Sequence, residues 1–399
     1  MKNMKKSQEI IFLAMVTLFW FAQYVYIPYQ TTFLTLNGVT SSFAGIIVGA
    51  YGITQLLLRF PVGLMADSIG IHKPFILIGG LASGLASLLR IFPSGGIGFL
   101  LANLFSGLAS SMWISFMVFY THHQAKDQQQ SATSRIILFN NAGMLLGFIV
   151  STLFYDRLGM TVICFFSLVA GIAAFGLGFF LEEAPSHHDR QTIKQLMVVI
   201  TGKRIWMFSI IALIQQGIQL TTTMSFTSQI LKDIGATSAV VGLASTVYMI
   251  SAVLFSAFAS SKKGGKKDPK FWIPVVLIIV AIYCFLVPRV DSIIAIFFLQ
   301  ILPGMSTGIL FSYATSEAMK EIPEDKKSTA MGFYQAFYAL GMTLFPMVTG
   351  QAVSRFNMET GYAILAMIAI IGCLLVTTFY LRNHYTSKRV NAHSKVSGE

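Results

Sequence analysis

Long apolar stretches dominate this sequence and limit what it can fold into. Each is close to the roughly 20 residues that a bilayer-spanning helix needs. We count twelve of them, at residues 10–33, 43–65, 74–93, 96–120, 135–155, 160–181, 204–230, 238–260, 271–289, 292–318, 328–354 and 359–381. Only 11% of the 399 residues are charged, which is too few for a soluble protein of this size. The sequence therefore predicts an all-α polytopic membrane protein with twelve transmembrane helices.

The chain also repeats itself with a shift of 197 residues. The segment 38–53 (GVTSSFAGIIVGAYGI) aligns with 235–250 (GATSAVVGLASTVYMI), and the two share two glycines, a threonine, a serine, a tyrosine and an isoleucine. A weak internal repeat in an apolar chain is typical of transporter folds, where a solute site lies between two halves. We expect two pseudo-symmetric six-helix bundles at 1–181 and 204–382, a linker at 182–203 and a tail at 383–399.

Basic residues predict the direction in which the helices cross the membrane. An even number of spans places both termini on one side, and the loops on that side hold all but five of the 28 lysines and arginines. Because cytoplasmic loops carry the excess of positive charge, we expect both termini, the linker and the tail in the cytoplasm. This orientation explains the net charge of +12 better than nucleic-acid binding does. The predicted location is the cell (inner or cytoplasmic) membrane.

Two loop motifs resemble the signatures of a known family. Residues 63–73 read GLMADSIGIHK, close to the G-x-L-a-D-[RK]-x-G-[RK]-[RK]-[RK] motif of the major facilitator superfamily, although basic residues are missing at 68, 71 and 72. Residues 323–332 read PEDKKSTAMG, similar to P-E-x-x-R-[GS]-x-A-x-G of the same family. The resemblance covers nearly the whole chain. It implies a transporter of the bacterial drug or metabolite permease type, which works by alternating access.

The first motif predicts a conformational latch. Arg59, Gly63 and Asp67 recur every four residues and so share one face of the second span, where the glycine admits a close neighbour. A carboxylate at the cytoplasmic rim can bind the amide end of a helix, and in this family the eleventh span begins nearby. We expect Asp67 to hold these two spans together when the cytoplasmic side is closed. The alternative is that Asp67 only ends its helix in headgroup water. The predicted latch comprises Arg59, Gly63, Asp67, Gly70, Lys73 and Ser328.

In this family the first, fourth, seventh and tenth spans line the central cavity, so their polar residues are candidates to contact a solute. The repeat supports this choice, because Asn103 aligns with Gln300 and Ser110 with Thr307. Amides near the bilayer centre are costly without partners, which favours a shared polar cavity over packing alone. The predicted cavity residues are Gln23, Tyr26, Gln30, Asn103, Ser110, Trp113, Asn140, Asn141, Gln215, Gln219, Thr222, Phe226, Gln300, Thr307, Tyr334, Gln335 and Tyr338.

Departures from the family pattern restrict the chemistry. Many proton-coupled members carry an arginine in the fourth span where this chain has Asn103, and the antiporter proline of the fifth span is replaced by Phe148. The first, fourth and seventh spans contain no acid, which disfavours a dedicated cation exporter. Glu317 is the one acid that we nominate for proton coupling, and ordinary ionisation at the rim is the alternative. An arginine that faced the cavity would suit an anionic or strongly dipolar solute.

An enzyme would need a metal site or a nucleophile within the spans. The histidine pairs at 122–123 and 187–188 are adjacent residues that do not share a helix face, and 264–267 lacks the pattern of a phosphate loop. We therefore expect no enzyme activity, no metal and no cofactor. The predicted protein is a monomeric secondary active transporter that exports a small amphipathic solute, such as a drug-like compound or metabolite. Import of a polar nutrient (a sugar or organic acid) is the second choice, and translocation of a lipid headgroup is the third.

Overall fold

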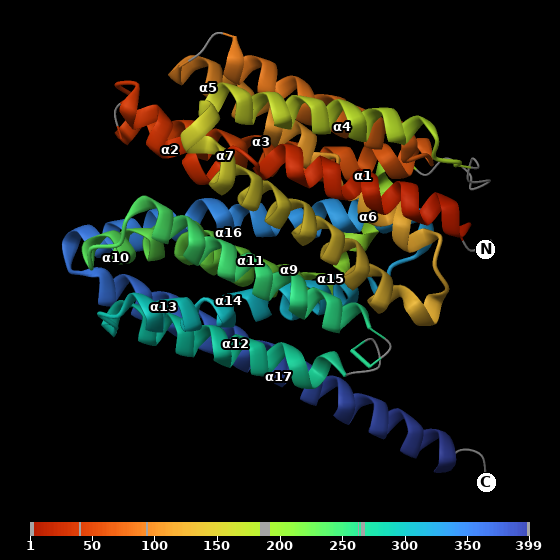
Figure 1. Ribbon diagram of the computed structural model, residues 1–399. Coiled ribbons are helices and arrows are strands. Elements are labelled where there is room, and N and C mark those ends of the chain that lie inside the picture. The colour runs from red at the N-terminus through yellow and green to blue at the C-terminus, as the bar shows by residue number, and fades with distance from the viewer. Residues whose placement is uncertain are drawn as a thin grey trace.

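The computed structural model describes residues 4–39, 41–92, 95–183, 192–261, 263–264 and 268–396 (Figure 1). Regular structure within these residues is helical throughout, which confirms the all-α prediction. The first half contains α1 (Lys6–Tyr24), α2 (Ile27–Leu36), α3 (Ser41–Ile69), α4 (Lys73–Ile91), α5 (Gly96–Ser111), α6 (Trp113–His122), η1 (Lys126–Gln128) and α7 (Gln129–Phe179).

The second half follows a short linker. The linker carries α8 (Ile193–Leu196) and η2 (Met197–Thr201). The second half contains α9 (Lys203–Thr221), η3 (Thr222–Phe226), α10 (Thr227–Asp233), α11 (Ser238–Ser260), α12 (Pro269–Leu286), η4 (Val287–Arg289), α13 (Ile293–Leu299), α14 (Ile301–Met305), η5 (Ser306–Leu310), α15 (Phe311–Met319), η6 (Glu324–Lys326), α16 (Lys327–Arg355) and α17 (Met358–Val396). Both termini lie at one end of the bundle, which we call the near end (Figure 1). The opposite end, which carries the turns after α2 and α10, is the far end.

The number of membrane spans depends on two breaks in the helices. Ten described helices are long and apolar enough to cross a membrane, and α8 to α9 adds an eleventh if its 73° bend is counted within one span. The 51-residue α7 is interrupted at Gly159, whose φ of 75° and ψ of 171° are not helical. If each arm of α7 is a span, the count is twelve. That number stays a prediction.

The linker is described only in part, whereas the tail is described as helix up to residue 396. Residues 184–191 of the linker lie outside the described residues, and α8 begins with a capping box in which Thr192 pairs with Gln195. The tail was expected to be separate from the last span, but α17 continues as helix to Val396. Residues 383–396 contain neither proline nor glycine, so nothing in their sequence ends the helix. The exact domain boundaries stay predictions.

The internal repeat is visible in the backbone. Gly38 and Gly235 stand at equivalent places and both have positive φ, 77° and 89°, a conformation that glycine adopts without strain. Each turn is closed by the same hydrogen bond, from the amide of Val39 to the carbonyl of Leu34 (3.0 Å) and from that of Ala236 to Leu231 (2.9 Å). The repeat therefore encodes the same helix end twice.

Side chains inside the two halves repeat as well. The hydroxyl of Tyr51 lies 2.8 Å from that of Ser110, and the hydroxyl of Tyr248 lies 2.8 Å from that of Thr307. These four residues are equivalent pairs under the 197-residue shift. The helices that carry them also break at matching places, at Met112 in the first half and at the π-helix η5 in the second. The two halves thus share an internal framework.

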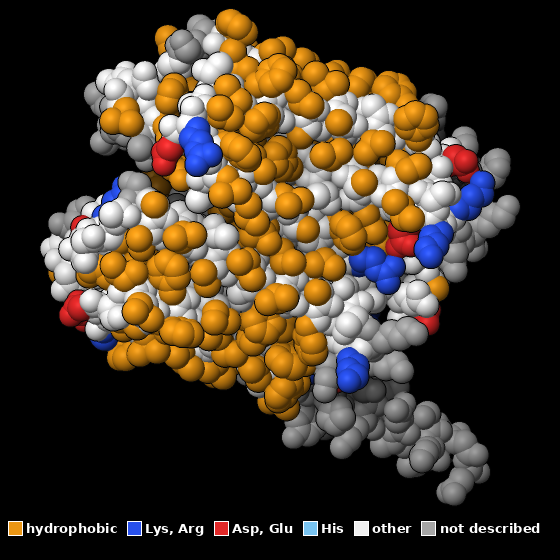
Figure 2. All heavy atoms as spheres, viewed as in Figure 1, with side chains coloured by type: hydrophobic (Ala, Val, Ile, Leu, Met, Phe, Trp, Pro, Cys, Tyr) orange, Lys and Arg blue, Asp and Glu red, His pale blue; other side chains and the backbone are white. Residues whose placement is uncertain are grey.

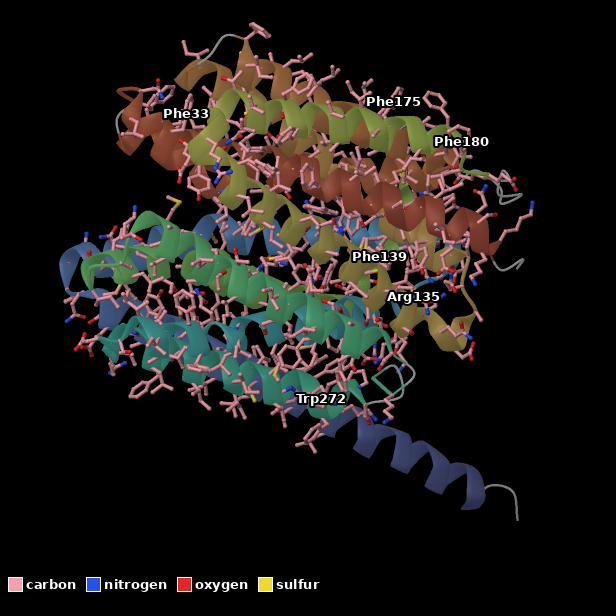
Figure 3. The ribbon with its side chains drawn as sticks, viewed as in Figure 1. Phe33, Arg135, Phe139, Phe175, Phe180 and Trp272 are labelled. Carbon is pink, nitrogen blue, oxygen red and sulfur yellow. The ribbon has the colours of Figure 1, made fainter. Side chains whose placement is uncertain are left out.

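The outer surface fits a membrane protein. Hydrophobic side chains cover the flanks of the bundle, whereas the charged side chains gather at its two ends (Figure 2). Phe180, which is 66% exposed, projects away from the bundle at the end of the second arm of α7 (Figure 3). Apolar surface of this extent is typical of a protein whose flanks lie in lipid.

Candidate solute pathway and latch

Two helix pairs form the seams between the halves. α3 packs along α16, and the first arm of α7 packs along α11. Polar residues bridge both seams near their middle. The guanidinium of Arg59 on α3 donates to Gln335 and Tyr338 on α16, and the amide of Asn141 on α7 donates to the hydroxyl of Ser256 on α11 at 2.9 Å.

A small pocket of about 60 Å³ lies between these seams and is lined by both halves. Its walls combine aromatic rings with amides and one cation. Among the described residues that line it, none carries a carboxylate. Of the predicted cavity residues, six line this central pocket: Trp113, Asn140, Asn141, Gln219, Thr307 and Tyr338. Arg59, which sequence analysis placed in the latch, also lines it, so this arginine reaches the cavity.

A larger pocket of about 360 Å³ opens between the halves at the far end. Figure 2 shows the surface notched between the two lobes at the end away from the termini. Residues of α2, α7, η3, α10 and α11 line this far pocket, and Phe226 is the predicted cavity residue among them. Lys232 is its one charged lining residue in the described part of the chain. The two halves are therefore separated by an open pocket at the far end.

The remaining predicted cavity residues contact other parts of their own half or of a seam. Gln215 donates to Gln219 at 2.9 Å, the Thr222 hydroxyl donates to the Ile218 carbonyl, Gln300 accepts from Tyr283, Tyr334 pairs with Thr315, and Gln335 accepts from Arg59. Gln30 is 3% exposed. A direct contact with a solute stays a prediction for all of them.

Two of the predicted residues, Tyr26 and Asn103, contact a buried cation of the first half. Arg90, on α4, is 3% exposed and donates to Asn103 (3.1 Å) and Ser106 (2.7 Å), and its guanidinium lies 3.5 Å from the ring centre of Tyr26. Gln23 donates to Ser110 at 3.1 Å beside it. These contacts lie within the first half and explain why Gln23, Tyr26, Asn103 and Ser110 do not line the central pocket.

The predicted latch residue Asp67 contacts the first turn of α16. Its carboxylate accepts from the backbone amides of Ser328 (3.0 Å) and Thr329 (2.6 Å), where the helix presents unpaired N–H groups. Gly63 lies one turn deeper, and a Cβ added there would be 2.2 Å from the carbonyl oxygen of Ser328. The α3–α16 seam is therefore closed at the near end in this structure. That this contact gates transport stays a proposal.

Other residues of the first motif have local roles. Gly70 ends α3 with a φ of 74°. Lys73 does not reach α16: its ammonium donates to the carbonyls of Phe179 (2.9 Å) and Leu181 (2.7 Å) at the end of α7. Glu183 accepts from the amides of His72 and Lys73, both at 2.7 Å, and so caps α4 as Asp67 caps α16.

Burial of His72 and Glu183 at the near end makes the stability of the protein depend on pH. Burial lowers the pKa of His72 from 6.5 to about 4, and His122 and His123 reinforce the shift. A lowered histidine pKa stabilises the fold above pH 6.5, and this stabilisation is lost as the pH falls toward 4. Glu183 acts in the opposite direction, because burial raises the pKa of its carboxyl, although the amides of Lys73 and His72 lower it.

We therefore expect His72→Gln to lose less thermal stability than the wild type between pH 6.5 and 4. Unfolding of the purified protein, followed by differential scanning fluorimetry across this range, measures the difference. His123→Gln is the matched control and should follow the wild type more closely. An unchanged pH profile in His72→Gln would show that another group causes the dependence.

Glu317 lies outside the central and far pockets and lines a third pocket, of about 510 Å³, between the halves at the near end. Its carboxylate is 5% exposed, forms an ion pair with Arg204, and lies 3.3 Å from the ammonium of Lys320. The hydroxyl of Tyr380 donates to it at 2.9 Å. A role in proton coupling would require the ion pair with Arg204 to open. That role stays a prediction.

Two related helical halves with a polar pocket between them define a polytopic membrane transporter. The family model of the Major Facilitator Superfamily matches residues 11–229 and, in a second match, residues 209–397. The chain belongs to the major facilitator superfamily, whose members are transporters and not enzymes.

Known relatives are distant but cover most of the chain. The inner membrane transport protein YajR of Escherichia coli (strain K12) is 22% identical over 392 residues, which cover 94% of this chain and 83% of that protein. The uncharacterized MFS-type transporter MJ1560 of Methanocaldococcus jannaschii is 21% identical over 355 residues, which cover 86% of this chain and 90% of that protein. The human organic anion transporter MFSD10 (TETRAN) has a similar structure, with a TM-score of 0.75 at 13% identity over 92% of this chain and 98% of that one. The last likeness shows the fold alone.

Proposed function

We propose that this protein exports a small amphipathic organic solute, such as a drug-like compound or a metabolite, by alternating access. It acts as a monomer in the cell membrane, with its termini in the cytoplasm. The observation that carries the proposal is the central pocket: aromatic rings and neutral amides from both halves meet there. Such a surface suits a partly apolar solute that is uncharged or anionic.

The two ends of the molecule support the alternating-access cycle. The far end opens into a pocket, while the α3–α16 seam is closed at the near end by the Asp67 contact and by the tight Gly63 approach. A second state would open the near end and close the far pocket around Phe226. Solute would enter the central pocket from the cytoplasm in that state and leave through the far pocket in the present one. A proton gradient is the proposed driving force.

A thermal-shift screen tests the solute class. The purified protein would be heated with antibiotics, organic acids, sugars and lipid headgroups, because a ligand that binds only the folded state raises its stability. We expect amphipathic compounds to raise the melting temperature and Asn140→Leu to remove the shift. Phe105→Ala, at a 44% exposed site on α5 outside the central pocket, is the control and should keep it. Stabilisation by sugars alone would replace export with nutrient import.

A further inference from the structure

Arg59 is a buried cation without a counter-ion in the described part of the chain. Its side chain is 1% exposed, and its partners are neutral: Gln55, Gln335 and the hydroxyl and ring of Tyr338. Burying a charge without an opposite charge is costly, even when hydrogen bonds satisfy part of it. A structural role alone does not explain why a cation occupies this position.

The internal repeat supplies the comparison. Under the 197-residue shift, Arg59 is equivalent to Ser256 and Tyr338 to Asn141. At the α7–α11 seam this pair forms a neutral hydrogen bond of 2.9 Å between Asn141 and Ser256. One seam is thus bridged at this depth by an amide and a hydroxyl. The other seam does not need a guanidinium to be bridged, so the charge has a different use.

The central pocket also contains hydrogen-bond donors that lack acceptors. The Nε of Arg59 and the indole N–H of Trp20 are both buried and have no partner within the described structure. Both side chains line the pocket, and both are at least nine-tenths buried. Unmet donors beside an unpaired cation favour a ligand that brings acceptor oxygens and negative charge. The rings of Trp113 and Tyr24 supply an apolar surface for the rest of such a ligand.

We propose that the solute is an organic anion whose acidic group binds Arg59, and that the anion and α16 compete for this guanidinium. The inference deepens the proposed export function and rests on it. When the near end is open, α16 is withdrawn and Arg59 takes the anion. When the near end closes, Gln335 and Tyr338 replace the anion as partners, and the solute is released toward the far end.

Because Arg59 lies on α3, this competition couples binding of the solute to opening of the near end. Arg59, Gly63 and Asp67 lie on one helix face, so the anion site and the latch belong to the same seam. A ligand shifts a conformational equilibrium only by its difference in affinity for the two states. Because α16 occupies Arg59 only in the closed state, an anion binds the open state more tightly and favours the opening of the near end.

The experiment compares three aromatic acids (1-naphthoate, 4-phenylbutyrate and indole-3-acetate) with their amides of the same shape. Binding to the purified protein is followed by tryptophan fluorescence, and spin labels at residues 69 and 321 report the width of the near end. We expect at least one acid to bind about tenfold more tightly than its amide and to lengthen the distance between the labels. Arg59→Ser, which copies the residue of the other seam, should lose both effects.

Two further variants keep the test decisive. Arg59→Lys retains the charge and should retain a preference for acids, even if Arg59→Ser folds poorly. Ser256→Ala changes the equivalent position of the other seam and should behave as the wild type. Equal binding of acids and amides, or a preference for acids that survives in Arg59→Ser, overturns this inference and leaves export intact. Absence of binding by every acid and amide overturns both.

Discussion

Replacing Gly63 with valine should prevent the near end from closing and reduce transport about tenfold or more. The new Cβ would lie 2.2 Å from the carbonyl oxygen of Ser328 and 2.9 Å from its carbon. Both are backbone atoms that cannot rotate away, so α16 must move. Overpacking of this kind costs about 1–3 kcal/mol, roughly 5- to 150-fold against the closed state. Distances between spin labels at residues 69 and 321 should lengthen without any solute.

Gly49 offers a matched control on the same helix. A Cβ at this position meets no atom within 4 Å, so Gly49→Val should leave the near-end distance and the melting temperature close to those of the wild type. If Gly63→Val also kept the wild-type distance, the α3–α16 seam would not be the closed gate. A change of equal size in both variants would point to a general effect of valine in α3.

Removing the carboxylate of Glu317 should destabilise the second half by about 3–5 kcal/mol, which is typical when one partner of a buried ion pair is lost. Glu317→Ala leaves Arg204, which is 13% exposed, without its buried partner and Tyr380 without its acceptor. Chemical unfolding monitored by the fluorescence of the purified protein measures the change. The reason is desolvation: the guanidinium keeps its charge but loses the group that compensates it.

Glu321 is the control, because it contacts the same arginine at 3.2 Å but is 68% exposed. Glu321→Ala should cost less than about 1 kcal/mol, as exposed ion pairs do. Equal losses of unfolding free energy in the two variants would show that burial does not strengthen the pair between Arg204 and Glu317. Glu317→Gln separates stability from coupling: a transport rate that keeps its full pH dependence in this variant would remove Glu317 from the proposed proton pathway.

Two kinds of feature could be predicted from the sequence: the turns that the internal repeat shares, and a contact at the end of a helix. Gly38 and Gly235 could be aligned, and the structure shows the same turn at both. The contact between Asp67 and the start of α16 followed from helix electrostatics together with the position that the family resemblance implied for the eleventh span. For the two turns, the chemistry of a few neighbouring residues determines the structure, so a single sequence is sufficient. The Asp67 contact joins residues 261 positions apart and needed the family resemblance as well.

Features that depend on which helix faces meet could not be predicted. The spacing of Gln23 and Tyr26 shows that they share a face, but only the fold shows that this face meets Arg90 within the first half. The available signal for Arg90 was an arginine within an apolar span. Arg204, the partner of Glu317, is 113 residues away, and nothing in the local pattern links them.

The most direct test of alternating access is a pair of distance distributions on one protein. Spin labels at residues 36 and 233 span the far end, and labels at residues 69 and 321 span the near end. We predict that an organic anion lengthens the near-end distance and shortens the far-end distance in the same sample. Two distances that stay fixed, or that lengthen together, would contradict the account.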